Sequence, residues 1–366
     1  MSKLRVGIVF GGRSTEHEVS VASATTVLQA LDPSRYVPVL IGVAHDGRWH
    51  VAEADAELLP EAVIGNAKSR TTFAGLRAGL ELLDRSDARP ALAAPLDAVF
   101  PIIHGRGGED GSLQGLLELA GIPYVGCGVL ATALCMDKVL QKAVLRDAGV
   151  PVVPCREISR HSAQLSTSAF IEAVEEAFPY PLFVKPTNTG SSVGVSKVRS
   201  RAHLQNAIKE ASRYDHDVLV EPGIEAREIE CSVLGGHTPQ ASVLGEIRYP
   251  GEFYDYEAKY ASEATQLVIP AEVTSGQSEE MRALALAAFR ALKCWGMARV
   301  DFFLDKKSGR IFLNELNSLP GFTDASMFPK LWEATGIALP ELVDRLIELA
   351  LERQHETASL EIRFRK

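Results

Sequence analysis

Short apolar runs separated by amphipathic segments recur in the N-terminal part of the chain. The run Leu4–Phe10 predicts a buried parallel-type strand, and residues 36–43 and 98–103 predict further strands. Thr15 and Glu18 have the spacing of a capping box ahead of an apolar stripe, so a helix is predicted to begin at Thr15. This alternation of strands and helices predicts an α/β layer domain.

Glycine-rich loops follow two of these strands, at residues 11–18 and 104–111. The ends of strands in open α/β sheets are where ligands bind, and glycines let the backbone approach a ligand closely. Glu16 and His104 are therefore candidate ligand-binding residues. The alternatives are that Glu16 complements a helix dipole and that His104 is structural. The first loop does not match GxGxxG, which weakens a nicotinamide-binding interpretation.

A domain boundary is predicted near residues 126–136, followed by a helix that runs to Gly149. Residues 182–186 and 195–198 then predict two strands joined by a Gly/Ser-rich hairpin. Residues 190–194 match the GxSxG nucleophile elbow, but an elbow must turn from a strand into a helix, so a hydrolase interpretation is rejected. The hairpin is either a phosphate cover or an ordinary flexible turn.

The next segments continue the strand pattern. Residues 218–222 predict a buried strand, and residues 227–233 alternate in the manner of a half-exposed strand. Residues 245–260 contain Pro, Gly and clustered aromatics, and a long loop inside a compact domain is often a lid. Residues 339–353 predict a helix whose leucines face a core or an interface.

The most informative pattern is a hairpin in which two apolar strands flank the polar turn 305–309. Side chains alternate along a strand, so Arg299 and Asp301 share one face, as do Glu315 and Asn317. Two carboxylates and an amide oxygen form a set of hard ligands that suits Mg²⁺, which often completes its shell with substrate phosphates. The alternative is a solvated polar face with an ordinary Arg–Asp pair.

Composition narrows the class of protein. The chain has 366 residues, of which 46% are hydrophobic and 23% charged, which predicts two or three ordinary globular domains. The net charge of −9 argues against a nucleic-acid or anionic-membrane partner. The five cysteines are scattered without CxxC spacing, and no apolar run approaches the roughly 18 residues of a membrane span. A cytoplasmic protein is expected.

Several motifs together resemble one family. In chain order they are GGRSTEHEVS, HGRGGEDGSLQG, MDK, FVKP with GSSVG, VEPG with REIEC, FYDYEAKY, RVDFF and NELNSLPGFT. This succession resembles the D-alanine–D-alanine ligases of the ATP-grasp superfamily. The resemblance extends from Leu4 to about residue 353, and it departs from the family pattern only in conservative choices such as Ser318.

The resemblance implies an α/β ATP-grasp fold with a Rossmann-like (preATP-grasp) N-terminal domain and a nucleotide held between two α+β subdomains. The expected domains are residues 1–130, 131–229 and 230–366, the last with the lid 245–260, the metal site and the second amino-acid subsite. The implied reaction joins two D-alanines through D-alanyl phosphate, with ATP as substrate and two Mg²⁺ or Mn²⁺ ions. A homodimer is also implied, and no nucleic-acid or membrane partner is expected.

Roles for individual residues follow from the resemblance alone. The implied catalytic residues are Glu16, Ser191, Tyr260, Arg299 and Gly321. The implied amino-acid contacts are His104 near the first subsite and Ser326 at the second carboxylate. The implied ATP-binding residues are Lys138, Lys185, Glu221, Ile224, Glu228, Lys259 and Asn314. The implied metal ligands are Asp301, Glu315 and Asn317.

Other functions stay open at this point. One is an ATP-grasp ligase with other substrates, including one that makes D-alanyl-D-lactate or D-alanyl-D-serine. The EAKY sequence ending at Tyr260 resembles dipeptide-forming rather than depsipeptide-forming ligases. Another is a nucleotide-binding regulator without catalytic chemistry, but such a regulator would be expected to have lost a residue such as Arg299 or Glu315.

Overall fold

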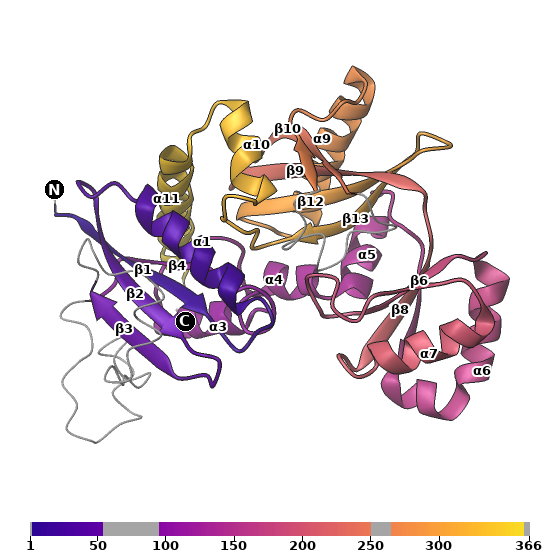
Figure 1. Ribbon diagram of the computed structural model, residues 1–366. Helices are drawn as coiled ribbons and strands as arrows, with labels where there is room; N and C mark the ends of the chain where they lie inside the picture. Colours follow the sequence, from indigo (N-terminus) through magenta and orange to yellow (C-terminus); the bar gives the residue numbers. More distant parts are fainter. Residues whose placement is uncertain (1, 54–94, 250–264, 362–366) are drawn as a thin grey trace.

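The computed structural model describes residues 2–53, 95–249 and 265–361, which form three sheets with helices around them (Figure 1). The N-terminal sheet has the order β3-β2-β1-β4, with β1, β2 and β4 parallel and β3 antiparallel to β2. Its elements are β1 (Leu4–Gly11), α1 (His17–Ala30), β2 (Tyr36–Val43), β3 (Trp49–Glu53) and β4 (Ala98–Pro101), followed by α3 (Ser112–Ala120) and α4 (Val129–Met136).

The two faces of this sheet bury different helices because side chains alternate along β1. Val6 and Ile8 belong to the core that includes α1, whereas Val9 belongs to the core that includes α3. A sheet covered on both faces explains why the first strand is a continuous apolar run. The expected α/β layer is confirmed.

The middle sheet is antiparallel, in the order β5-β8-β6-β7. Helices α6 and α7 pack against it and share its core (Figure 1). Its elements are α5 (Lys138–Asp147), β5 (Arg156–Ser159), α6 (Arg160–Ala177), β6 (Leu182–Pro186), β7 (Ser196–Val198), α7 (Arg201–Ala211) and β8 (Asp217–Pro222). Strands β6 and β7 pair through the Gly/Ser-rich loop, so the predicted hairpin is confirmed and the nucleophile elbow is absent from this loop.

The C-terminal sheet is also antiparallel, in the order β11-β10-β9-β12-β13. Helix α9 shares one core with it, and α10 packs on β10. Its elements are β9 (Ala226–Gly235), β10 (Gln240–Arg248), β11 (Gln266–Val268), α9 (Ser275–Ala291), β12 (Gly296–Asp305), β13 (Ile311–Asn317), α10 (Met327–Thr335) and α11 (Leu339–Ala358).

Helix α11 returns to the N-terminal sheet and lies beside α1 (Figure 1). Leu342 and Leu346 are buried in the same core as β1. Arg35 pairs with Asp344 at 2.5 Å, and the Arg353 guanidinium donates to the Gly126 carbonyl at 2.6 Å. The end of the chain therefore fastens the N-terminal sheet to the C-terminal one.

Some sequence-based boundaries are wrong. Helix α1 begins at His17 rather than Thr15, and its N-cap, Glu16, makes no side-chain capping bond. The expected capping box between Thr15 and Glu18 does not form, because the N-cap position falls on Glu16, whose carboxylate accepts a hydrogen bond from Ser191. The predicted strand at 98–103 ends at Pro101, and the last helix continues to Ala358 rather than ending at Arg353.

Two further corrections concern the C-terminal sheet. The segment predicted as a half-exposed strand is β9, whose residues Ile229–Leu234 are buried because helices cover both faces of the strand. Ile229 shares a core with α9, and Ser232 on the other face contacts α10. The predicted lid begins inside β10, since residues 245–248 belong to that strand. Residues 250–260 of the lid lie outside the described residues.

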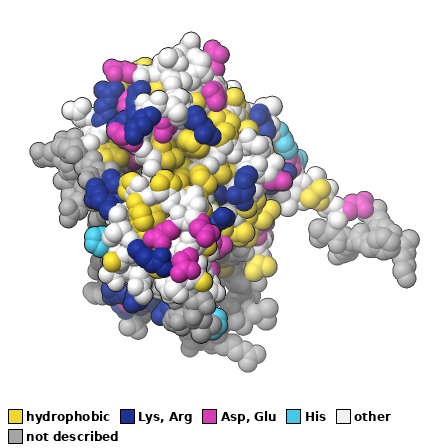
Figure 2. Space-filling view, turned by 90° about the vertical axis from the view of Figure 1, so that its right-hand side faces the viewer, with side chains coloured by type: hydrophobic (Ala, Val, Ile, Leu, Met, Phe, Trp, Pro, Cys, Tyr) yellow, Lys and Arg dark blue, Asp and Glu magenta, His cyan; other side chains and the backbone are white. Residues whose placement is uncertain are grey.

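Surface features are those of a folded protein with mixed charge. On the face seen in Figure 2, basic and acidic side chains are interspersed around a band of hydrophobic ones. Within the described ranges, no helix combines the length and the hydropathy needed to cross a bilayer. All five cysteines are free thiols.

Candidate active site

Two adjoining cavities lie where the three sheets meet. The smaller has a volume of about 140 Å³ and its lining includes Glu16, His104, Gly321, Ser326 and Asn317. The larger has a volume of about 800 Å³ and its lining includes Lys185, Glu221, Ile224, Glu228, Asp301 and Asn314. Lys138, Ser191, Arg299 and Glu315 line both cavities. All predicted site residues that the structure describes therefore gather around these two adjoining cavities.

Glu16 connects the N-terminal loop to the Gly/Ser-rich hairpin. Ser191 Oγ donates a short hydrogen bond to Glu16 Oε1, although the two residues are far apart in sequence. Both side chains are buried. A Cβ at Gly190 would lie 3.0 Å from Glu16 Oε2, so glycine allows this close approach of the hairpin.

The hairpin backbone is held in an uncommon conformation. Ser191 and Ser192 have φ values of 48° and 57°, in the left-handed region that non-glycine residues seldom adopt. Successive residues in such a turn can direct their N–H groups toward one concave surface, which is how backbone anion-binding nests form. Backbone strain of this kind concentrates at functional sites.

His104 lies deep in the wall of the smaller cavity. Its Nδ1 is 3.7 Å from Glu109 Oε1, and its Nε2 is 3.4 Å from Ser23 Oγ. Burial alone would lower the pKa of His104, but the hydrogen bond and charge of Glu109 outweigh it and raise the pKa. Ser23 Oγ also accepts from the Phe322 N–H at 3.2 Å, which ties this wall to the Gly321 segment.

Gly321 and Ser326 form the opposite wall. Ser326 is the N-cap of α10, and its Oγ accepts from the Thr323 N–H at 3.0 Å. A Cβ at Gly321 would lie 2.7 Å from Ser326 Oγ, so any larger residue would displace the serine hydroxyl. The free end of a helix and a glycine N–H next to a cavity favour anionic groups such as a carboxylate.

The β12–β13 hairpin carries the cluster that its sequence predicted. Arg299 lies opposite Asn317, and Asp301 lies opposite Glu315. The Arg299 guanidinium binds Asp301 through two nitrogens at 2.8 and 2.7 Å and lies 3.1 Å from Glu230. Burial alone would lower the pKa of Arg299, but the two carboxylates outweigh it and raise the pKa.

A register shift in this hairpin directs another predicted residue, Asn314, toward the site. The register shifts between Asp301 and Phe302, so that Asn314 is an extra residue on β13. Asn314 lines the larger cavity.

Gln141, from α5, fixes the edge of β13 by bonding both the N–H of Leu316 at 2.9 Å and its carbonyl at 3.0 Å. An otherwise exposed strand edge is thus satisfied, and Glu315 is held in place.

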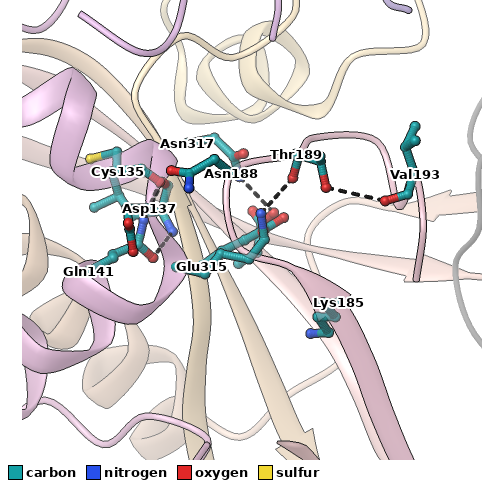
Figure 3. A network of polar contacts seen from close by, with 12 residues as sticks. Cys135, Asp137, Gln141, Lys185, Asn188, Thr189, Val193, Glu315 and Asn317 are labelled. Carbon is teal, nitrogen blue, oxygen red and sulfur yellow. Dashed lines mark hydrogen bonds and ion pairs between the residues drawn. The ribbon is translucent and has the colours of Figure 1, made fainter. Parts of the chain in front are cut away.

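The side chain of Lys138, at the start of α5, contacts both the β6–β7 hairpin loop and β13. Its Nζ donates to the Thr189 carbonyl at 2.6 Å and lies 3.8 Å from Glu315 Oε2. Figure 3 shows Thr189 and Glu315 close to one another in the site. Asp137 caps the helix by accepting from the N–H groups of Val139 and Leu140 at 3.0 and 2.9 Å. The cap fixes where α5 begins and therefore where Lys138 points.

A buried ionic cluster forms the floor of the larger cavity. Glu221 Oε2 is 2.7 Å from Lys185 Nζ, and Glu221 Oε1 is 2.7 Å from Lys142 Nζ. Burial alone would raise the pKa of Glu221, but the two ammonium groups outweigh it and lower the pKa to about 2. Burial lowers and Glu221 raises the pKa of Lys185, and the net shift is upward.

Glu228 stands at the rim of the same cavity, where Tyr249 Oη donates to its Oε1 at 2.6 Å. Ile224, in the loop after β8, contributes an apolar side chain to the lining. The larger cavity thus combines apolar walls with lysines and carboxylates at fixed points, as small-molecule sites commonly do.

Two predicted residues, Lys259 and Tyr260, lie outside the described residues. Sequence reasoning also missed residues that support the site, namely Ser23, Glu109, Gln141, Lys142, Glu230 and Tyr249. Two of them had a signal in the sequence. Lys142 follows Lys138 by one helical turn, and Glu230 follows Glu228 by the two-residue period of a strand.

Comparison with known proteins identifies the chain. Residues 5–127 match a family profile described as the D-ala D-ala ligase N-terminus, and residues 144–348 match one described as the D-ala D-ala ligase C-terminus. D-alanine–D-alanine ligase A of Chromobacterium violaceum is 49% identical over 359 residues, which is 96% of each chain. The chain belongs to the D-alanine–D-alanine ligase family.

Other members of the family extend this likeness. D-alanine–D-alanine ligase A of Escherichia coli K12 is 48% identical, with 96% of this chain and 97% of the relative covered. The solved ligase of Coxiella burnetii aligns with a TM-score of 0.81 and 36% identity, over 98% of this chain and 97% of that one. VanG D-Ala:D-Ser ligase of Enterococcus faecalis aligns with a TM-score of 0.83 and 32% identity, over 95% and 100%. The ATP-grasp fold expected from the sequence is confirmed.

The metal ligands implied for this family supply only some of the oxygen ligands that a hard cation needs. Asp301 and Glu315 offer carboxylates and Asn317 an amide, and Asn317 Nδ2 donates to Asp301 at 3.0 Å. Among the described residues, no group of three or more His, Cys, Asp or Glu gathers as a metal site. Two carboxylates and an amide suit Mg²⁺ or Mn²⁺ when phosphate oxygens supply the remaining ligands. The donor set therefore fits a metal that arrives with a nucleotide.

Proposed function

We propose that the protein catalyses the ATP-dependent joining of two D-alanines to D-alanyl-D-alanine, the dipeptide used in peptidoglycan synthesis. Membership of the family implies the use of ATP. The observation that supports the proposal best is that the two cavities adjoin and share wall residues. A small cavity with a mainly polar lining adjoins a larger one lined by lysines, and the two share Lys138, Ser191, Arg299 and Glu315.

The first step forms an acyl phosphate. A carboxylate oxygen of the first D-alanine attacks the γ-phosphorus of ATP, the bond from the γ-phosphorus to its bridging oxygen breaks, and ADP leaves. Glu16 would hold the ammonium of this D-alanine, with Ser191 orienting the carboxylate of Glu16 and His104 nearby. Lys138 and Lys185 would hold phosphates, since positioning and charge neutralisation supply most of the catalysis available to phosphoryl transfer.

The second step forms the peptide bond. The amine of the second D-alanine, having lost a proton, attacks the acyl carbon, and inorganic phosphate leaves with both bonding electrons. Arg299 and the Gly321 N–H would stabilise the oxyanion of the tetrahedral intermediate, where fixed donors act most strongly. Ser326 would hold the carboxylate of the second D-alanine.

The remaining roles concern the nucleotide and the metal. Glu221 and Ile224 would line the adenine, Glu228 would bind the ribose, and Asn314 would contribute to the phosphate end. Asp301, Glu315 and Asn317 would hold two Mg²⁺ or Mn²⁺ ions, which when bound neutralise phosphate charge. Lys259 and Tyr260, outside the described residues, would complete the phosphate contacts and the link from Ser191 to Glu16. An acyl phosphate hydrolyses readily, so exclusion of water is also required.

The experiment is a reconstitution with purified protein, ATP, Mg²⁺ and D-alanine. Phosphate release that depends on D-alanine, and a dipeptide detected by mass spectrometry in equal amount, are the expected results. L-alanine in place of D-alanine is the control and should give neither. ATP hydrolysis without dipeptide at any D-alanine concentration would contradict the proposal.

One alternative has a specific observation behind it, because VanG, a D-Ala:D-Ser ligase, aligns over 95% of this chain at 32% identity. A mixed ligase would join D-alanine to D-serine in preference. Competition between the two second substrates at equal concentration distinguishes these functions. We expect D-alanyl-D-alanine to predominate, because the dipeptide ligases of Chromobacterium violaceum and Escherichia coli are 49% and 48% identical to this chain.

The proposal includes a homodimer that acts in the cytoplasm, where ATP is available. This part of the proposal rests on the resemblance to the family. Light scattering during gel filtration measures the mass directly. A monomer at micromolar concentration would contradict this part of the proposal and leave the reaction untouched.

A further inference from the structure

Lys142 is a buried cation to which neither the sequence motifs nor the proposed reaction gives a role. It lies on α5, one turn after Lys138, and its side chain is only 3% exposed. Its Nζ is 2.7 Å from Glu221 Oε1 and donates to the Val153 carbonyl at 3.2 Å. Burying an ammonium group is costly unless the charge is paired, so this position requires an explanation.

Glu221 divides its two oxygens between two lysines. Its side chain is 2% exposed, and its other oxygen, Oε2, is 2.7 Å from Lys185 Nζ. Lys185 is 14% exposed and lines the larger cavity, whereas Lys142 lies behind Glu221, outside that lining. The cluster carries two positive charges and one negative charge. Its net charge of +1 therefore faces the space proposed for the nucleotide.

This arrangement differs from a simple ion pair between Lys185 and Glu221. Such a pair would be neutral, and the carboxylate would cancel the attraction of the ammonium for a phosphate. Glu228 and Glu315 also line the cavity, and their charges add to the negative potential that a phosphate would meet. A second buried lysine offsets Glu221 without occupying any of the nucleotide's space.

We infer that Lys142 is a positioning residue for nucleotide binding: it offsets the charge of Glu221, so that the ammonium of Lys185 remains available to the phosphates of a nucleoside triphosphate. The inference rests on the proposed function, since it takes the larger cavity as the nucleotide site. It adds a residue that does not touch the nucleotide. Its effect depends on phosphate charge and not on the base or the ribose.

The charge count gives a test with three variants. Lys142→Met lowers the net charge of the cluster to zero, and Glu221→Gln raises it to +2. The double variant restores the net charge of +1. Methionine has nearly the length and volume of the lysine stem, which limits changes in packing. At an effective dielectric constant of about 20, one charge at about 8 Å from a phosphate changes the affinity for the nucleotide by more than tenfold. Because salt screens part of this interaction, we expect a change of about tenfold.

Isothermal titration calorimetry with MgATP and with adenosine separates phosphate charge from contacts to the base and ribose. The measured quantity is the dissociation constant of adenosine divided by that of MgATP. We expect this ratio to fall about tenfold in Lys142→Met and to return to within threefold of wild type in the double variant. A ratio unchanged in Lys142→Met, or a double variant no better than Lys142→Met, would overturn the inference.

The design remains decisive if Lys142→Met does not fold, because Glu221→Gln and the double variant still differ by one charge. The ratio should then be about tenfold higher in Glu221→Gln, and equal ratios would overturn the inference. In steady-state assays, Lys142→Met should raise the KM for ATP and leave the KM for D-alanine unchanged. Dipeptide synthesis by the wild type tests the proposed function separately, so failure of either idea is recognised on its own.

Discussion

Ser191→Ala removes the hydroxyl that donates to Glu16, the carboxylate proposed to bind the first D-alanine. Both residues are buried, so water cannot readily replace the lost donor. A hydrogen bond to a charged group is worth about 1.5–3 kcal/mol, and 1.4 kcal/mol corresponds to a tenfold change in an equilibrium constant. The KM for the first D-alanine should therefore rise roughly ten- to hundredfold, with a smaller change in the KM for ATP.

Ser192→Ala is the matched control. Ser192 has the same left-handed backbone, with φ of 57° against 48° for Ser191, so alanine costs the backbone about the same at either position. Ser192 lines the larger cavity and is not in the lining of the smaller one. Its variant should change the KM for D-alanine less than twofold.

The assay follows phosphate release at saturating ATP while D-alanine is varied, and thermal unfolding confirms that each variant folds. Equal increases in the D-alanine KM for the two alanine variants would show that the hairpin backbone, and not the hydroxyl, is responsible. A Ser191→Ala variant with wild-type D-alanine kinetics would refute the reasoning outright.

Other predictions concern charge in the site. Arg299→Lys should slow dipeptide formation by ~10²-fold, the usual scale for losing an oxyanion donor, because lysine lacks the planar fork of the guanidinium. Rapid-quench measurement of the dipeptide would show this slower rate. A wild-type rate would exclude Arg299 as an oxyanion donor. Glu315→Gln should abolish phosphoryl transfer without unfolding the protein, which circular dichroism and phosphate release together measure. Glu221, whose pKa is lowered from 4.5 to about 2, should stabilise the fold above pH 4.5 and lose that contribution as the pH falls toward 2. Urea midpoints at pH 5 and pH 3 should therefore differ more in wild type than in Glu221→Gln, and equal differences would contradict the assignment.

The features that sequence predicted best are those set by local periodicity. The alternation along residues 299–317 predicted the hairpin and the shared faces, and in the structure Asp301 lies opposite Glu315. The Gly/Ser-rich turn between residues 182–186 and 195–198 was also recognised from its neighbours. Strand pairing inside one hairpin depends on nearby residues, and a pattern of side chains is enough to specify it.

Features that depend on distant contacts were not predictable in the same way. Thr15 and Glu18 have the spacing of a capping box, but α1 begins at His17, and the carboxylate of its N-cap Glu16 accepts a hydrogen bond from Ser191 in the distant β6–β7 loop. The burial of Ile229–Leu234 depends on helices packed on both faces of β9, which the segment's own pattern does not specify. Lys142 has an ordinary helical position in the sequence, and only the fold brings it to Glu221.

The central claim is that a carboxylate is activated by direct transfer of the γ-phosphoryl group of ATP. D-alanine labelled with ¹⁸O in both carboxylate oxygens tests it most directly, because the attacking oxygen stays with phosphorus when the second amine displaces phosphate. Mass spectrometry of the released inorganic phosphate should find one ¹⁸O for each dipeptide formed. Dipeptide synthesis that releases unlabelled phosphate, or that yields AMP and pyrophosphate, would contradict the account.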